Sequence, residues 1–125
     1  MHTDDPRLNE LSRLVIGCSF AVLNTLGAGF LEKIYENALV YELKKLGLNV
    51  VQQRGISIVY AGTIVGEYTV DLLIENMLLV ELKAVKNLED IHKAQCTNYL
   101  KGTGLKVCLL LNFGNPKLQI KRIAH

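Results

Sequence analysis

Two acidic residues and a lysine are conspicuous in the middle of the sequence because nearly all of their neighbours are apolar. Asp71 lies in one apolar run, Glu81 and Lys83 lie in the next, and Asn76 falls midway between the two acids. A hairpin that turns near Asn76 would place Asp71 opposite Glu81, with their Cβ atoms ~5 Å apart. Strand alternation then puts Lys83 on the same face as Glu81. Three charges in a buried strand pair are costly unless something compensates them.

A hard divalent cation would provide that compensation. Carboxylate oxygens are the ligands that Mg²⁺ prefers, with water and substrate phosphate in its remaining positions. Lys83 could then orient and help deprotonate the water that attacks phosphorus. A simpler interpretation is a buried ion pair of Lys83 with Asp71 or Glu81, because acid-x-Lys sequences are common in strands. The pattern by itself leaves both interpretations open.

Polar residues in two predicted helices are further candidates. Gln95 and Tyr99 are four residues apart and share a helix face, so they could hydrogen-bond the lysine or a nucleic-acid strand. A half-exposed polar face with a packed tyrosine ring would explain them as well. Glu32 lies at the edge of an apolar helix face, where it could join a metal site or hold one of its waters. Alternatively, it only favours the helix dipole.

The elements that must position these residues follow from the apolar pattern. Helical spacing predicts helices over about 7–26, from after the 27–29 glycine segment to Gly47, and over 88–101 with a stop at Gly102. Runs rich in β-branched residues predict strands over 49–53, 56–60, 64–74, 77–84, 106–112 and 118–123. The order is ααββββαββ, a mixed α/β layer architecture with the last strand at an edge.

Composition limits the alternatives. The 125 residues contain no repeat or linker, which predicts one domain over 1–125. Cys18, Cys96 and Cys108 are far apart in apolar surroundings, which predicts reduced thiols in a cytoplasmic protein. No apolar run approaches the roughly 20 residues of a membrane helix, so no membrane partner is expected. Up to Glu81 the chain has ten acidic and six basic residues, and after it two acidic and eight basic residues. A basic C-terminal half beside an acidic cluster is compatible with a polyanion held near a metal ion.

With these residues considered, the chain resembles the GxxExxY family of the PD-(D/E)XK nuclease superfamily. The resemblance rests on an ordered set spread over nearly the whole chain: Gly29, Glu32, Tyr35, Asp71, Glu81, Lys83, Gln95 and Tyr99. Val70 replaces the proline of the superfamily's name. The resemblance implies a restriction-endonuclease-like αβββαβ core, with a mixed sheet flanked by helices.

The resemblance also implies roles for the residues of the site. Asp71, Glu81 and the backbone carbonyl of Leu82 would bind Mg²⁺ or Mn²⁺, and Lys83 would handle the attacking water. Glu32 would act as an extra ligand or hold a water. Gln95 and Tyr99 match a Gln-x-x-x-Tyr helix motif that supports the site and contacts nucleic acid.

The predicted function is therefore metal-dependent hydrolysis of phosphodiester bonds in DNA, or alternatively in RNA. A homodimer is a further expectation, because a small nuclease needs two sites to cut both strands. The rival hypothesis is a non-catalytic nucleic-acid-binding or protein-interaction module with the same fold, since a fold does not prove a function.

Overall fold

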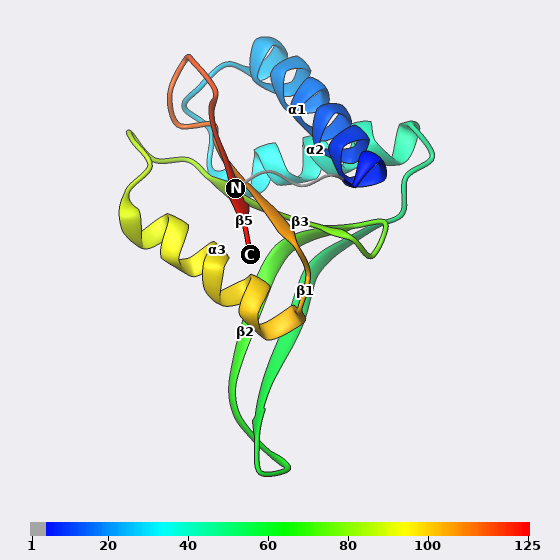
Figure 1. The fold of residues 1–125 in the computed structure, drawn as a ribbon. Helices are drawn as coiled ribbons and strands as arrows, with labels where there is room; N and C mark the ends of the chain where they lie inside the picture. Colours follow the sequence, from blue (N-terminus) through cyan, green and yellow to red (C-terminus); the bar gives the residue numbers. More distant parts are fainter. Residues whose placement is uncertain (1–4) are drawn as a thin grey trace.

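The structure, a computed structural model, describes residues 5–125 and is built around a five-stranded mixed sheet. Its elements are α1 (Pro6–Leu26), α2 (Glu32–Lys45), β1 (Val50–Tyr60), β2 (Thr63–Ile74), β3 (Leu78–Lys83), α3 (Asp90–Thr103), β4 (Val107–Asn112) and β5 (Gln119–Ala124). The strands lie in the order β1-β2-β3-β4-β5; β3 and β4 are parallel and the other neighbours are antiparallel. Helices α1 and α2 cover one face of the sheet and α3 covers the other (Figure 1).

Two hydrophobic clusters hold these layers together. Residues of α1 and α2 pack with Leu72, Val80 and Leu82 on one face of the sheet. On the other face, α3 contributes Cys96, Tyr99 and Leu100 to a smaller cluster. Cys18, Cys96 and Cys108 are free cysteines. No helix within 5–125 has the length and apolar character needed to cross a membrane.

The entry to α2 is fixed by a buried tyrosine. Helix α1 ends at Gly27, whose φ of 74° reverses the chain. The hydroxyl of Tyr35 donates to the carbonyl of Gly27 at 2.6 Å and accepts the N–H of Phe30 at 3.0 Å. These two bonds hold the segment between α1 and α2 against the start of α2. They therefore fix the position of Glu32, the first residue of that helix.

One predicted boundary between strands is wrong. The segments 49–53 and 56–60 form the single strand β1, so the observed order is ααβββαββ. Gln53 has a φ of 54°, and pairing with β2 is interrupted there. The same register continues on both sides, from Gln52↔Leu72 to Arg54↔Val70, so the ladder holds β1 together.

The predicted end of α3 is also wrong. The helix continues past Gly102 to Thr103 and ends at Gly104, which has the left-handed φ of 73° typical of a helix C-terminus. A Cβ at Gly102 would lie 2.8 Å from Cδ1 of Ile58. Gly102 therefore allows α3 to approach β1 closely and does not end the helix.

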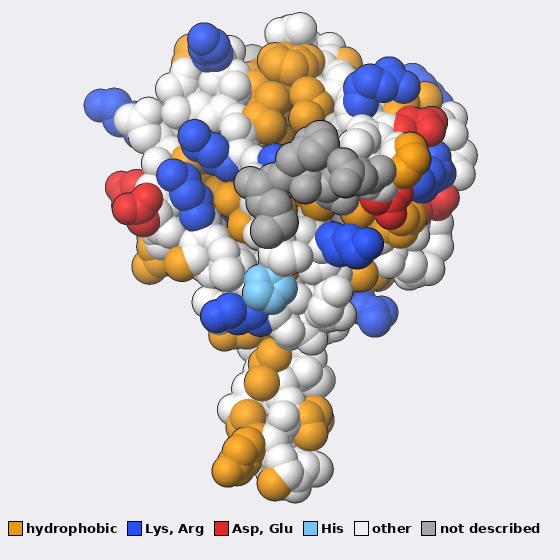
Figure 2. All heavy atoms as spheres, in the orientation of Figure 1, with side chains coloured by type: hydrophobic (Ala, Val, Ile, Leu, Met, Phe, Trp, Pro, Cys, Tyr) orange, Lys and Arg blue, Asp and Glu red, His pale blue; other side chains and the backbone are white. Residues whose placement is uncertain are grey.

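The ends of β1 and β2 form a hairpin arm that projects from the body of the molecule (Figure 1). Its tip carries four exposed apolar residues, Val59, Tyr60, Ile64 and Val65. Figure 2 shows hydrophobic side chains along this arm and Lys and Arg side chains on the body. The sequence contains no Lys or Arg between Arg54 and Lys83, so the arm has no cation for a nucleic-acid backbone.

Candidate active site

The two predicted carboxylates meet across the β2–β3 hairpin. Glu75 and Asn76 both have positive φ, and the N–H of Met77 donates to the carbonyl of Ile74 at 3.0 Å, which closes the turn. The register Leu72↔Val80 leads to Asp71 and Glu81 as the next residues along the two strands. The predicted opposition of Asp71 and Glu81 is therefore found in the structure.

Backbone amides hold both carboxylates. The N–H of Asp71 donates to Oε1 of Glu81 at 3.1 Å, and the N–H of Leu82 donates to Oδ2 of Asp71 at 2.9 Å. Asp71 is 9% exposed and Glu81 is 4% exposed. Because backbone amides move little, these bonds already hold the two carboxylates in place. The carboxylates therefore lose little conformational entropy when a ligand binds.

Lys83 lies on the predicted face of β3. Its Nζ is 3.8 Å from Oε2 of Glu81, whereas Val80 and Leu82 pack in the cluster on the opposite face. The ion pair that the simpler interpretation requires is therefore also present. Lys83 is the last residue of β3, and its carbonyl accepts the N–H of Phe113 at 2.8 Å.

Asn112, which the sequence analysis did not identify, fixes the chain just after Lys83. Its fully buried side chain accepts the N–H groups of Val85 and Gly114, each at 3.0 Å, and donates to the carbonyl of Val85 at 2.8 Å. It also donates to Oε1 of Gln119 at 2.7 Å. Its position at the end of a buried strand, beside the parallel partner Lys83, is the one signal that sequence reasoning could have used.

Glu32 lies close enough to the hairpin to interact with its charges. Burial raises the pKa of Glu32, Lys83 and the backbone N–H of Ala84 lower it, and Asp71 and Glu36 raise it further. The structure thus brings Glu32 near Asp71 and Lys83. Its role as a ligand or a water-holding group stays a prediction.

A buried acid, Glu36, lies one turn after Glu32 along α2 and is linked to Asp71. Glu36 is 2% exposed and accepts hydrogen bonds from Lys33, Gln52 and Gln53. Nε2 of Gln53 lies 3.1 Å from both carboxylate oxygens of Glu36 and 3.2 Å from Oδ1 of Asp71. Gln53 therefore bridges two carboxylates from a left-handed backbone conformation, a kind of strain that often marks functional sites.

Gln95 and Tyr99 share a face of α3 but have different surroundings. Tyr99 is 2% exposed, and its hydroxyl donates to Oε2 of Glu81 at 3.3 Å. Burial, followed by the charge of Glu81, raises the pKa of Tyr99, which keeps this hydroxyl a donor. Gln95 instead lines a hollow of about 480 Å³ together with Lys83.

The pKa of Glu81 reflects the balance of charge in the site. Burial, and after it the nearby charge of Asp71, raises the pKa of Glu81 to about 7, although the N–H of Asp71, Lys83 and the Tyr99 hydroxyl act in the opposite direction. At neutral pH the positive charge and donors around Glu81 therefore offset only part of the effect of burial and of the Asp71 charge.

This donor set fits a hard divalent cation. No group of three or more Asp, Glu, His or Cys side chains is preformed as a metal site in the part of the chain that the structure describes. Mg²⁺ commonly uses one or two carboxylates and takes its other ligands from water and substrate phosphate. Asp71 and Glu81 match that requirement, and a cation would offset the charge that raises the pKa of Glu81.

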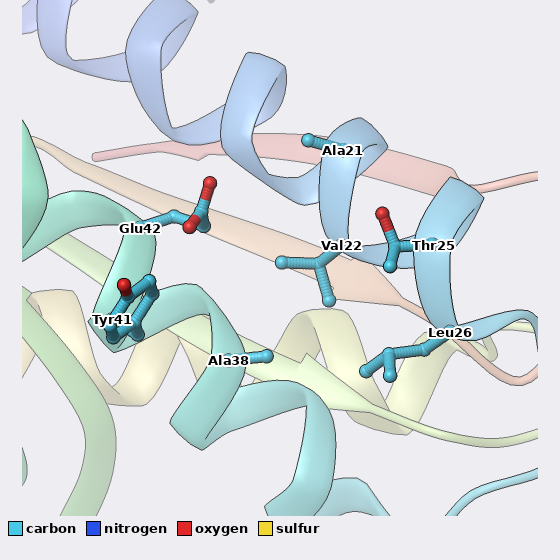
Figure 3. Close-up of a pocket in the computed structure, with 7 residues that line it drawn as sticks. All are labelled: Ala21, Val22, Thr25, Leu26, Ala38, Tyr41 and Glu42. Atoms are coloured by element: carbon cyan, nitrogen blue, oxygen red, sulfur yellow. The ribbon is translucent and has the colours of Figure 1, made fainter.

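Another hollow, of about 240 Å³, lies between α1 and α2. Figure 3 shows Val22 and Leu26 of α1 facing Ala38 of α2, with Tyr41 and Glu42 at one end. It contains none of the predicted site residues, and most of its lining is apolar.

Comparison with known proteins agrees with the fold. The sequence model of the PD-(D/E)XK nuclease superfamily matches residues 9–123. The structure is similar to that of SSO0001, with a TM-score of 0.62, 19% identity and 75% of this chain covered; the chain spans half the length of that protein. It is also similar to an alkaline exonuclease (LHK-Exo) from Laribacter hongkongensis, with a TM-score of 0.55, 15% identity, and 100% of this chain and 72% of the other covered. No curated protein sequence matches the chain significantly.

The predicted restriction-endonuclease-like αβββαβ core is confirmed, because α2, β1, β2, β3, α3 and β4 follow in that order within a mixed sheet flanked by helices. The narrower GxxExxY resemblance stays a prediction. A match over residues 9–123 covers most of the chain. The chain therefore belongs to the PD-(D/E)XK nuclease superfamily.

Proposed function

We propose that this chain is a nuclease that uses Mg²⁺ or Mn²⁺ to hydrolyse phosphodiester bonds in DNA, with RNA as the alternative substrate. The observation that carries the proposal is the Asp71–Glu81 pair, held by backbone amides across one hairpin with Lys83 3.8 Å from Glu81. Membership of a nuclease superfamily supports it at the level of the reaction class.

The resemblance to the superfamily suggests a role for each residue of the site. Asp71, Glu81 and the carbonyl of Leu82 would hold the cation, and Glu32 would add a ligand or hold a water. When bound, the cation stabilises the charge that develops on the phosphate and makes a water more acidic. Lys83 orients the attacking water. Tyr99 and Gln53 position the carboxylates of Glu81 and Asp71 through their hydrogen bonds.

Cleavage of labelled single- and double-stranded DNA and RNA with Mn²⁺ tests the proposal. Asp71→Ala and Lys83→Ala should abolish cleavage in folded protein, whereas Lys86→Ala, which removes an exposed lysine three residues away, should not. Unchanged cleavage in the folded Asp71→Ala or Lys83→Ala variant would refute the assignment.

The rival function is a non-catalytic nucleic-acid-binding module, and the Lys83–Glu81 ion pair is the observation in its favour. It predicts binding that weakens with salt and needs no divalent metal. Calorimetric titration with Mn²⁺ separates the two, because only the nuclease requires a competent metal site. Heat of binding that disappears in Asp71→Ala supports the nuclease, and no binding at all supports the module.

A homodimer would supply the two sites needed to cut both strands of a duplex. Sedimentation velocity at the concentration of the cleavage assay tests this part of the proposal. A monomer that still makes double-strand breaks would contradict it.

A further inference from the structure

The hollow beside Lys83 leads to a more specific statement about the substrate. We propose that it takes one unpaired nucleotide of the substrate strand, whose base stacks on Tyr68, so that single-stranded or frayed nucleic acid is the substrate class. This inference rests on the proposed function, because it places the nucleotide next to the lysine of the cleavage site.

The hollow has the size and lining of a ligand site. Its volume of about 480 Å³ lies within the roughly 300–1,000 Å³ of typical ligand pockets. Tyr68 of β2, Lys83 of β3, and His92, Gln95 and Asn98 of α3 line it. A cation, an aromatic ring and several amide or imidazole groups thus meet in one cavity, and these are the groups that bind a phosphate, a base and its polar edge.

Tyr68 provides a rigid surface for stacking. Its ring packs edge-to-face against Tyr99, with centroids 5.7 Å apart and an angle of 68° between the planes. Tyr99 is buried, while 38% of Tyr68 remains exposed. Because packing already restricts the ring, little conformational entropy is lost when a base stacks on it.

The polar groups around the ring are available to a ligand. Nδ1 of His92 accepts the N–H of Glu89 at 3.0 Å, so the neutral imidazole carries its proton on Nε2 as a donor. The amide of Asn98 donates to the carbonyl of Ala94 at 3.0 Å, which leaves its oxygen as an acceptor. Within residues 5–125, the Gln95 amide has no hydrogen-bond partner, although it lines the same cavity as Lys83.

The surroundings favour one strand over two. A base in a duplex is stacked and paired, so it reaches an aromatic ring only after it leaves the helix. On the Tyr68 side, the projecting β1–β2 arm has no Lys or Arg between Arg54 and Lys83. Beyond Arg54 the arm therefore has no cation for the phosphates of a complementary strand, whereas Lys83 lines the hollow that takes the bound strand.

Oligonucleotide binding with Ca²⁺ in place of Mn²⁺ tests the inference without relying on cleavage. The probes are a single-stranded oligomer, the same oligomer with one abasic position, and the blunt duplex. Tyr68→Leu should weaken binding of the single strand by about ten-fold or more, the scale of one base–aromatic stack. Tyr68→Phe keeps the ring and should bind within about two-fold of the wild type. Tyr60→Leu changes an exposed tyrosine at the arm tip and should leave binding unchanged.

The abasic oligomer makes the test specific to the proposed contact. If the missing base is the one that stacks on Tyr68, Tyr68→Leu should have almost no further effect on it. The inference would be overturned if the abasic position and Tyr68→Leu each weakened binding by the same factor whether or not the other was present. It would also be overturned if the blunt duplex bound as tightly as the single strand, or if no oligomer bound. Binding that depends on Tyr68 in a protein that never cleaves would refute the proposed nuclease alone. Cleavage that is indifferent to Tyr68→Leu would refute this inference alone.

Discussion

Oε1 of Glu81 accepts the backbone N–H of Asp71 at 3.1 Å, so one of the two site carboxylates is held by the residue that carries the other. The arrangement keeps two acids close together in a buried hairpin. Its electrostatic consequence is a pKa of Glu81 raised to about 7, chiefly by burial and then by Asp71. The proton on Glu81 therefore couples folding, metal binding and pH.

The metal-free protein should lose stability as the pH rises from about 4.5 to about 7. In this window folded Glu81 holds a proton that the unfolded chain, with its ordinary pKa of 4.5, has already released. The stabilisation is complete below pH 4.5 and lost above about pH 7. Glu81→Gln cannot ionise, so in EDTA at pH 8 it should be more stable than the wild type by up to about 3 kcal/mol.

Urea unfolding of both proteins at pH 4.5 and pH 8 measures this difference. The two should have similar stability at pH 4.5, and the gap should open only at pH 8. Added Mn²⁺ at pH 8 should stabilise the wild type more than the variant, because a ligand stabilises the state that binds it. An equal difference at both pH values would contradict the assignment of the pH effect to Glu81.

Gln53 should tolerate glycine better than alanine. Both substitutions remove the amide that bridges Glu36 and Asp71, but only alanine keeps a Cβ at a φ of 54°. Gln53→Gly should therefore be more stable than Gln53→Ala by about 1 kcal/mol in urea unfolding. Gln52, the preceding strand residue, has no positive φ and is the matched control, where alanine should be the more stable. If the glycine and alanine variants rank in the same order of stability at Gln53 and at Gln52, the result would argue against backbone strain at Gln53.

The hairpin could be predicted from sequence because its pattern is local. Asp71 and Glu81 are symmetric about Asn76, and a slip of one residue would turn Glu81 to the face on which Val80 and Leu82 pack in the hydrophobic cluster under α1 and α2. Register, turn and the common face of Glu81 and Lys83 all follow from that constraint. The end of α3 depended on more distant packing. Gly102 and Gly104 are both typical of a helix C-terminus, and only the contact of Gly102 with Ile58 shows that Gly102 lies inside the helix.

The supporting residues could not be predicted because their partners are distant in sequence. Asn112 bonds to Val85, 27 residues away, and Gln53 reaches Asp71, 18 residues away. Neither residue type nor local spacing reveals such bonds. Glu36 could have been suspected, since it lies one helical turn after Glu32, but its burial depends on donors from β1.

Asn112→Ala should destabilise the protein by about 2–4 kcal/mol. The substitution leaves the part-buried N–H and carbonyl of Val85 without their partner and opens a cavity where the fully buried Asn112 side chain was. Asn115→Ala is the control, because Asn115 makes only exposed hydrogen bonds to Lys86 and Lys117 and should cost less than about 1 kcal/mol. Chemical denaturation measures the free energy of unfolding of both variants. Equal losses of stability would show that the hydrogen bonds of Asn112 do not hold the chain after Lys83 in place.

Tyr99→Phe should weaken Mn²⁺ binding at pH 7 and leave it nearly unchanged at pH 9. The hydroxyl donates to Oε2 of Glu81 at 3.3 Å and thereby lowers the pKa of that carboxyl. Without the donor the pKa of Glu81 rises further, so at pH 7 more of the protein carries a proton that the cation must displace.

At pH 9 Glu81 is ionised in both proteins, and the difference in affinity should disappear. The phenylalanine ring preserves the packing of Tyr99 in the core under α3, so a general loss of structure is not expected. Calorimetric titration at the two pH values separates the explanations. A loss of affinity that is the same at pH 7 and pH 9 would mean that the hydroxyl acts on the shape of the site and not on the protonation of Glu81.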